Sequence, residues 1–253
     1  MARKRHLRHL LYGLISVLLV GLILLLICIK VSGSSQSEDA ESHEDAFTIG
    51  LNPDRDYLIV VNDNHEYVFG GDYDQALQPD LIYASDCYGI PTPIEHATNL
   101  AFGMLRSALH SQGFEVELYS AYRTKEDQEW VVDNYGHNDD WTSFNTVLPA
   151  GYSEHHTGLM VSFVIWWPDE KGQLDWREIT SELWAANPEF RAVRNTLADY
   201  GFIERYPAGK EDITGVAFEP YEIRFVGSSA VAHEIMDNNL CLEEYLEGYL
   251  EFE

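Results

Sequence analysis

The sequence predicts an α+β fold that follows one N-terminal membrane-spanning helix. Three observations support this class: an apolar run without charge over residues 10–29, several helical patterns beyond it, and only a few β-rich runs without regular βαβ alternation. At 253 residues, the chain suits one domain of ordinary size with appendages, and such a domain is large enough to bury its own core.

The uncharged run predicts a membrane anchor, because about 20 apolar residues span the hydrocarbon core of a bilayer. Four basic residues within the first eight positions favour a cytoplasmic N-terminus. We therefore expect a basic cytoplasmic tail at 1–9, a single-pass anchor at 10–31 in the cell membrane, and an extracellular remainder. A cleaved signal peptide is the alternative, and the small residues at 32–34 leave it open.

The exported part is strongly acidic. The first 30 residues hold five of the 16 basic residues and none of the 42 acidic ones, which leaves 11 basic against 42 acidic side chains. Such a charge repels nucleic acid and anionic lipid, so neither is an expected partner, and a solvated acidic surface explains it. Residues 32–55 are expected to form an acidic flexible linker, and 56–253 the folded domain. Cys87 and Cys241 lie outside the anchor, and two cysteines leave their pairing open.

The first expected strand is the β-prone run Tyr57–Val61, which polar residues follow. A strand over 114–118 comes later, where apolar and polar residues alternate, and it leads to Tyr122 and Arg123. Between the two strands we expect a helix that ends before a glycine at 113, because four apolar residues recur about one turn apart: Leu100, Met104, Leu105 and Leu109.

Thr124 with Asp127 three residues on is typical of a helix N-terminus, so a helix is expected through Trp130. The apolar run at 159–165 predicts a strand buried on both faces. A helix over Ala192–Tyr200 should end at a glycine. A last strand, Glu222–Val226, should lead into a helix from Ser229, and Glu243, Glu244 and Tyr245 near the C-terminus are interpreted as a solvated helix face.

Three blocks of sequence stand out: Ser120-Ala121-Tyr122-Arg123-Thr124, Gly151-Tyr152-Ser153-Glu154-His155-His156-Thr157-Gly158, and the segment from Tyr200 through Glu219-Pro220-Tyr221-Glu222 to Gly227. In this order they resemble the VanY-type D-alanyl-D-alanine carboxypeptidases of the LAS zinc metallopeptidases. The resemblance covers roughly residues 56 to 248. It implies a central, mainly antiparallel sheet flanked by helices, and a peptidoglycan stem peptide ending in D-Ala as the partner.

The resemblance implies zinc as the cofactor, with His155 as its first ligand and Glu219 as the general base. In the family pattern Ser-x-His-x-x-Gly-x-x-x-Asp, the aspartate ligand position is occupied by Ser162. In the pattern Glu-Pro-Trp-His, Tyr221 replaces the tryptophan, and Glu222 replaces the second histidine ligand. The two departures therefore fall on ligand positions.

A catalytic zinc needs three protein ligands and an open position for water. The hydroxyl of Ser162 is neutral and a poor ligand, whereas the carboxylate of Glu222 can bind zinc at about 2.0–2.2 Å. His156 cannot compensate, because adjacent residues on extended chain point to opposite faces. Without a metal, Glu219 and Glu222 would crowd two carboxylates together. We therefore expect ordinary zinc catalysis to be impaired.

By the same resemblance, Arg123 holds the terminal carboxylate of the peptide and Gln128 supports it. An arginine suits this role because its planar guanidinium can grip a carboxylate with two hydrogen bonds. Ser153 and Tyr152 flank the metal block and are expected to contact the substrate backbone.

Three functions remain open on the sequence alone. The first is a membrane-anchored carboxypeptidase that releases D-Ala through a rearranged metal site. The second is a pseudoenzyme that binds wall peptides or regulates a partner without cleaving them. The third is an interaction domain in which the old site is a relic.

Overall fold

The computed structural model describes residues 51–69, 79–135 and 147–250, all of which belong to one compact unit, Asp45–Glu253. The predicted tail and anchor, and most of the predicted linker, lie outside the described residues. In the part that the structure describes, no helix is both long enough and apolar enough to span a membrane. Arg55, which the sequence assigned to the linker, is buried and pairs with Glu95, so it belongs to the folded part.

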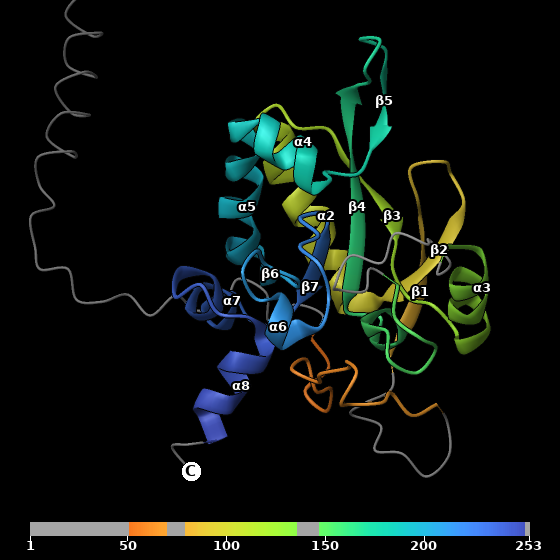
Figure 1. The fold of residues 1–253 in the computed structure, drawn as a ribbon, viewed down its shortest axis with the longest axis vertical. Helices are drawn as coiled ribbons and strands as arrows, with labels where there is room; N and C mark the ends of the chain where they lie inside the picture. The colour runs from red at the N-terminus through yellow and green to blue at the C-terminus, as the bar shows by residue number, and fades with distance from the viewer. Residues whose placement is uncertain (1–50, 70–78, 136–146, 251–253) are drawn as a thin grey trace, which may run out of the picture. The chain divides into compact units, whose positions relative to one another are not determined.

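A five-stranded antiparallel sheet forms the centre of the domain (Figure 1). Four strands are ordered β3-β4-β7-β6, and β5 pairs with the outer half of β4. Their bounds are β3 (Val116–Ser120), β4 (Met160–Pro168), β5 (Leu174–Arg177), β6 (Phe202–Glu204) and β7 (Glu222–Phe225). A separate antiparallel hairpin joins β1 (Leu81–Ser85) to β2 (Pro91–Glu95).

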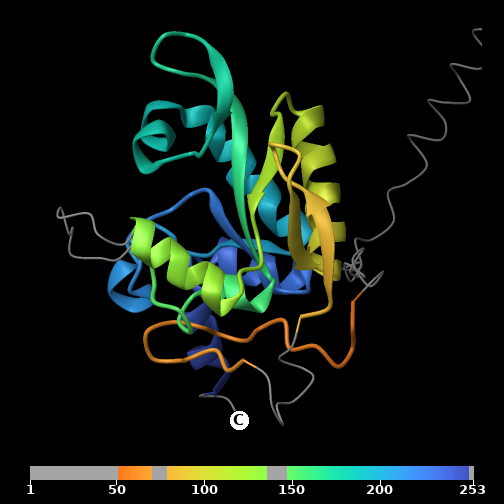
Figure 2. The same cartoon turned by 90° about the vertical axis from the view of Figure 1, so that its right-hand side faces the viewer.

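Helices lie on both sides of β4. Figures 1 and 2 show α2 and α5 on one side of this strand and α3 on the other. The helices are α2 (His96–Ser111), α3 (Lys125–Tyr135), α4 (Ser181–Ala186), α5 (Arg191–Leu197), α6 (Glu211–Thr214), α7 (Ser229–Asp237) and α8 (Leu242–Leu250), and short 3-10 turns cover Glu154–Thr157, Pro188–Phe190 and Ala198–Tyr200. The predicted class is confirmed: α+β, with an antiparallel sheet flanked by helices.

The central strand β4 is buried on both faces, as its apolar run predicted. Val161, Phe163 and Ile165 belong to the main core, whereas Met160 and Ser162 line a cavity on the opposite face. Side chains alternate between faces along a strand, so the core and the cavity share the same strand as their wall.

The helix α2 packs on the core through Leu105 and Leu109, as its pattern predicted, and also through smaller residues that the pattern did not include. Its buried positions include Ala97, Ala101 and Leu105, which are spaced four residues apart. Leu100 and Met104, which helped to predict the helix, are 39% and 44% exposed.

The first predicted strand, Tyr57–Val61, is wrong as a strand. This segment has no ladder partner among the described residues, and its backbone is held by side chains instead. The guanidinium of Arg224 donates hydrogen bonds to the carbonyl oxygens of Tyr57 and Ile59, and the amide of Val61 donates to Glu154. A buried arginine thus replaces the neighbouring strand that β-prone residues would ordinarily pair with.

The acidic pair near the C-terminus is not a solvated helix face, so that interpretation was wrong. Both oxygens of Glu243 accept hydrogen bonds from Arg205, at 2.7 and 3.0 Å. Glu244 forms an ion pair with Lys210 at 2.8 Å, and Tyr245 is 5% exposed. The basic partners lie more than 30 residues upstream, so local sequence does not indicate these contacts.

A buried ion cluster joins α8 to the short helix Glu154–Thr157. Glu154 pairs with Arg205 at 3.0 Å and with Arg224 at 2.6 Å, and all three side chains are fully buried. Glu243 completes the cluster through Arg205. Buried charges are tolerated only when they are paired in this way, so the cluster fixes the helix that carries the next residue, His155.

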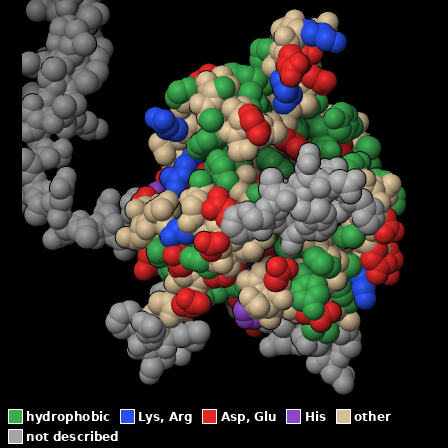
Figure 3. All heavy atoms as spheres, in the orientation of Figure 1, with side chains coloured by type: hydrophobic (Ala, Val, Ile, Leu, Met, Phe, Trp, Pro, Cys, Tyr) green, Lys and Arg blue, Asp and Glu red, His purple; other side chains and the backbone are tan. Residues whose placement is uncertain are grey.

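Cys87 and Cys241 both carry free thiols, and Cys241 is buried. On the surface, Figure 3 shows acidic side chains distributed over the face in view rather than gathered in one patch. This distribution fits the expected solvated acidic surface.

Candidate active site

An open cavity of about 680 Å³ lies against β4, on the face of the sheet opposite the main core. Its walls come from α3, from the segment around Leu148 and from the chain leading into β7. Seven of the eight residues predicted for the site line this cavity: Arg123, Gln128, Ser153, His155, Ser162, Glu219 and Glu222. The structure therefore brings together residues from blocks that are up to 100 positions apart.

His155 presents one ring nitrogen to the cavity. Its Nδ1 atom donates a hydrogen bond to the carbonyl oxygen of Ala121, which leaves the lone pair on Nε2. Burial, together with the charge of Arg123, lowers the pKa of His155. The short helix that carries it ends at Gly158, whose φ of 73° is unfavourable for a side chain. His155 is therefore a neutral, oriented imidazole of the kind that binds metals.

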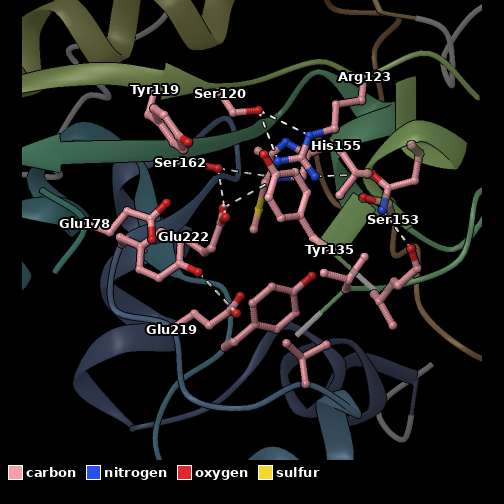
Figure 4. Close-up of a pocket in the computed structure, with 18 of the residues that line it drawn as sticks. Tyr119, Ser120, Arg123, Tyr135, Ser153, His155, Ser162, Glu178, Glu219 and Glu222 are labelled. Carbon is pink, nitrogen blue, oxygen red and sulfur yellow. Dashed lines mark hydrogen bonds and ion pairs between the residues drawn. The ribbon is translucent and has the colours of Figure 1, made fainter. Parts of the chain in front are cut away.

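Ser162 and Glu222 face each other across β4 and β7. They are direct partners in the ladder, and Ser120 is the partner of Ser162 on β3, so the three residues form a row across the sheet. The Ser162 hydroxyl donates a hydrogen bond of 2.8 Å to Oε1 of Glu222. His155 Nε2 lies 3.5 Å from the Ser162 hydroxyl and 3.6 Å from Oε2 of Glu222 (Figure 4).

Arg123 is held by two neighbours at the edge of the cavity. Its Nε and one terminal nitrogen donate to the Ser120 hydroxyl at 3.2 and 3.1 Å, and the other terminal nitrogen donates to Oε1 of Gln128 at 3.2 Å. Gln128 is itself fixed by donating to the carbonyl oxygen of Leu148 at 2.7 Å. These bonds use three of the five N–H donors of the guanidinium, so each terminal nitrogen keeps one donor for a ligand. Ser120, to which the sequence assigned no role, completes this clamp.

Glu219 is buried opposite the row of Ser162 and Glu222. Its side chain accepts a hydrogen bond from the Tyr221 hydroxyl at 3.3 Å. Burial, followed by the charges of Glu222 and Glu178, raises the pKa of Glu219 to about 9. Burial also opposes ionisation of Glu222, but the charge of Arg123 and the hydrogen bond from the Ser162 hydroxyl favour its carboxylate, and the pKa of Glu222 lies below its usual value. The two carboxyls therefore share the site as one neutral acid and one carboxylate.

Glu178 is a cavity residue that sequence reasoning missed. It follows β5, is half-buried, and lines the cavity on the side of Ser162 and Glu222 (Figure 4). Among the described residues it forms no hydrogen bond or ion pair. Burial and the nearby charge of Glu222 raise the pKa of Glu178. It belongs to none of the three sequence blocks, so only the pairing of β5 with β4 could have indicated it.

His156 points away from the cavity, as expected, although for a different reason. The two histidines lie on a 3-10 turn rather than on extended chain. The Nε2 atom of His156 accepts a hydrogen bond from the amide of Gly151, and its Nδ1 donates to the carbonyl oxygen of Arg123. Both ring nitrogens are thus used to hold the loops around the site.

Tyr152 is the predicted site residue that does not line the cavity. It packs beside a small cluster of buried residues that includes Leu148 and Tyr206. Its neighbour Ser153, which is 4% exposed, does line the cavity. Substrate contact by either residue stays a prediction, and the position of Ser153 supports it better.

The residues at the three ligand positions fit a catalytic zinc only in part. Two ligands at ~2.1 Å from a tetrahedral metal lie ~3.4 Å apart, close to the 3.6 Å between Nε2 of His155 and Oε2 of Glu222. Oε2 of Glu222 is also buried without a hydrogen-bond partner. The third position, however, offers only the neutral hydroxyl of Ser162, which is a poor zinc ligand and donates a hydrogen bond to Glu222. Within the described ranges, no three His, Cys, Asp or Glu side chains converge closely enough to hold a metal as they stand.

The antiparallel sheet, the buried imidazole beside a glutamate and the arginine clamp define a cleft of the LAS metallopeptidase class. The family model for the VanY D-alanyl-D-alanine carboxypeptidases matches residues 92–228, more than half of the chain. YodJ of Bacillus subtilis (strain 168) is 30% identical over 199 residues, which are 78% of this chain and 68% of that protein. The chain belongs to the VanY D-alanyl-D-alanine carboxypeptidase family.

Other relatives agree with this assignment. A D-alanyl-D-alanine carboxypeptidase of Enterococcus faecium is 35% identical over 130 residues, which cover 51% of this chain and 35% of the relative. Among solved structures, a mutant of the vancomycin resistance D,D-pentapeptidase VanY with Zn(II) has a TM-score of 0.56 at 27% identity, covering 75% of this chain and 98% of that chain. VanYB in complex with D-alanine-D-alanine has the same TM-score and identity, covering 76% and 97%.

Proposed function

We propose that this protein binds peptidoglycan stem peptides that end in D-Ala, and that its ability to cleave them is impaired. The observation that carries the proposal is the contrast between two parts of one cavity. Arg123 is fully assembled with Ser120 and Gln128, whereas the hydrogen bond between Ser162 and Glu222 occupies the two positions that hold zinc ligands in the family.

The proposed peptide binding follows from the N–H donors that Arg123 keeps available for a ligand. One N–H on each terminal nitrogen suits a carboxylate, which has two acceptor oxygens, and a charge-assisted pair of this kind is strong. Arg123 is the one cationic side chain that lines the cavity among the described residues. A peptide ending in D-Ala presents a single terminal carboxylate, and VanYB is a relative solved with D-alanine-D-alanine bound.

The proposed impairment of cleavage follows from the chemistry of the residues at the zinc-ligand positions. When bound, a zinc ion would polarise the scissile carbonyl and lower the pKa of a water molecule. His155 and Glu222 could hold it, and its positive charge would favour the carboxylate form of Glu219 that a general base requires. Ser162 supplies no charge, and its neutral hydroxyl, which donates its proton to Glu222, is a poor zinc ligand. The three ligand positions of the family therefore provide one imidazole, that of His155, and one carboxylate, that of Glu222. A catalytic zinc has three protein ligands.

Calorimetry with an N-acetylated peptide ending in D-Ala-D-Ala tests the binding half. The wild type should bind, and Arg123→Ala should weaken binding by more than about tenfold, since a charged hydrogen-bonded pair is lost. Arg106→Ala is the matched control, because Arg106 pairs with Glu117 away from the cavity. Equal affinity for the wild type and Arg123→Ala would refute the role of Arg123.

Carboxypeptidase activity is the second candidate function. It is favoured by one observation, the spacing of 3.6 Å between His155 and Glu222, which suits two ligands of one metal. Release of D-Ala from the same peptide, measured with Zn²⁺, Mn²⁺ or Co²⁺ present, would establish this function. The alternative of a pseudoenzyme that binds peptides or regulates a partner without cleaving peptides would then be unnecessary.

The proposal also places the domain outside the cell on an uncleaved anchor at residues 10–31. The uncharged run and the basic residues before it support this arrangement. Fractionation of cells expressing the full chain should recover it with membranes, and added protease should digest the domain in intact cells. Recovery of a chain that lacks the first 30 residues from the medium would instead indicate a cleaved signal peptide.

A further inference from the structure

We infer that the aromatic side chains at the mouth of the cavity bind the sugar chain to which a stem peptide is attached, so that the protein recognises sugar and peptide together. These side chains, which we call the aromatic rim, are Tyr88, Tyr119, Trp130 and Tyr135. The inference deepens the proposed function and rests on it for the position of the peptide. It assigns a role to four residues that belong to none of the three sequence blocks.

The aromatic rim exposes a large apolar surface to solvent. Tyr88, Trp130 and Tyr135 are 64%, 57% and 60% exposed, and Tyr119 is 40% exposed. All four side chains line the cavity, and Figure 4 labels Tyr119 and Tyr135 there. Scattered exposed aromatic residues are ordinary, but a group of them gathered at one cavity marks a binding surface.

The aromatic rim consists of two pairs of rings from different elements. Tyr88, on the turn between β1 and β2, has its ring centroid 6.5 Å from that of Tyr119 on β3, and the ring planes meet at 71°. The centroids of Trp130 and Tyr135 on α3 are 5.8 Å apart, with the planes at 73°. In each pair one ring meets the other edge-on, which is a favourable arrangement that orients both rings.

The turn that carries Tyr88 is tied to the central sheet. The carboxylate of Asp86 accepts hydrogen bonds from the amides of Tyr88 and Ile90, both at 2.8 Å. The amide of Cys87 donates to the carbonyl oxygen of Leu118 on β3, also at 2.8 Å. A surface that is held in place before binding loses little conformational entropy when a ligand arrives. The turn is therefore organised for binding in the absence of any ligand.

A neutral sugar chain suits this surface better than a charged polymer does. The faces of a sugar ring carry C–H groups, which pack favourably on the electron-rich face of an aromatic ring. The surroundings are acidic, because desolvation, followed by neighbouring groups that include Asp175, Asp86 and Glu178, raises the pKa of Tyr88. A polymer that contains phosphate would be repelled here. In peptidoglycan the carboxyl group of N-acetylmuramic acid is used in the bond to the stem peptide, so the sugar chain is neutral.

The separation between Arg123 and the aromatic rim fits the length of a stem peptide. Gln128, which bonds to Arg123 at 3.2 Å, lies on the same helix as Trp130 and Tyr135. These two residues follow it by about 3 and 10 Å along the helix axis, at ~1.5 Å per residue. A peptide of five residues spans at most about 17 Å. A peptide whose terminal carboxylate lies at Arg123 can therefore cross the cavity and bring its sugar to the rim.

Calorimetry with two probes tests the aromatic rim. One is an N-acetylated pentapeptide ending in D-Ala-D-Ala, and the other is the same peptide joined to the disaccharide of N-acetylglucosamine and N-acetylmuramic acid. The wild type should bind the second probe at least about tenfold more tightly than the first, and Tyr88→Ala combined with Trp130→Ala should reduce this ratio to about one. Tyr83→Ala is the matched control and should keep the wild-type ratio, because Tyr83 is 73% exposed on β1 but does not line the cavity.

The indole N–H resonance of Trp130, assigned by its loss in Trp130→Phe, is a second readout that needs no peptide. It should shift when a neutral oligomer of N-acetylglucosamine is added and stay in place with poly(glycerol phosphate). Equal wild-type affinity for the two peptide probes would overturn the inference, as would a resonance that the sugar oligomer leaves in place. If the oligomer shifts the resonance but the wild type binds neither peptide probe, the proposed peptide binding fails and the aromatic rim stands.

Discussion

The hydroxyl of Ser162 donates a 2.8 Å hydrogen bond to Glu222 directly across the ladder between β4 and β7. In the family pattern these two positions hold an aspartate and a histidine, each a zinc ligand. Here the two side chains form a hydrogen bond with each other, in which Ser162 is the donor and Glu222 the acceptor. The same strand register that would place two ligands around a metal thus places two residues that bond to each other.

Restoring both ligand positions should restore zinc binding. Ser162→Asp combined with Glu222→His rebuilds a set of His, Asp and His around His155. The double variant should gain more zinc affinity than the two single changes together, because residues that complete one coordination sphere act non-additively. Titration calorimetry of the four proteins measures this. A well-folded double variant that binds zinc no more tightly than the wild type would show that the metal position is misassigned.

The metal-free protein should lose stability as the pH rises, because of Glu219. Its pKa is raised in the folded state from 4.5 to about 9, so the folded protein holds this proton more tightly than the unfolded chain. The favourable contribution is complete below the unfolded value and is lost as the pH rises through the folded one. Glu219→Gln should remove this slope, so its stability relative to wild type should increase between pH 5 and about 9.

Urea denaturation in the presence of chelator, at several pH values, measures this difference. Titrating groups far from Glu219 affect both proteins alike, so the difference between the two curves reports Glu219 together with Glu222 and Glu178, whose charges act on it. Parallel curves for the wild type and Glu219→Gln would mean that Glu219 ionises in the folded site as it does in water.

Removing the charge of Glu154 should destabilise the fold strongly. Glu154→Gln would leave Arg205 and Arg224 buried with one carboxylate fewer, and breaking a buried pair in this way costs about 3–5 kcal/mol. Glu170→Gln, at an exposed turn, should change stability by less than about 0.5 kcal/mol. Equilibrium unfolding of both variants checks this, and a small effect at Glu154 would show that the cluster contributes little.

Peptide affinity should depend on Gln128 through Arg123. Gln128→Ala removes the acceptor that holds one terminal nitrogen of Arg123, so the guanidinium should become mobile and affinity should fall several-fold. Gln112→Ala is the control, because Gln112 bonds to Thr196 on a distant part of the surface. The test is peptide calorimetry on folded variants. A loss that Gln112→Ala shares would indicate a general effect on the domain.

Much of the site could be predicted from the sequence because its residues lie within blocks of fixed spacing. His155, Arg123 and Glu219 were found this way, and the structure places all three on one cavity. Strong local signals also predicted elements correctly. The helix cap at Thr124 is confirmed by reciprocal hydrogen bonds with Asp127.

The parts of the fold and of the site that could not be predicted depend on contacts between residues far apart in the sequence. Glu178 enters the site because β5 pairs with β4, and Glu243 is buried in an ion pair with Arg205. Tyr57–Val61 has the composition of a strand, but Arg224 satisfies its carbonyl groups in place of a neighbouring strand. Local composition carries no information about such partners.

The most direct test of the account is to incubate the protein with an N-acetylated peptide ending in D-Ala-D-Ala and added Zn²⁺, and to measure binding and D-Ala release on the same sample. We predict binding that Arg123→Ala abolishes or strongly weakens, with D-Ala release no faster than in a sample without protein. Release of D-Ala with repeated turnover, dependent on Glu219, would contradict the account and show that the site of His155, Glu222 and Ser162 remains catalytic.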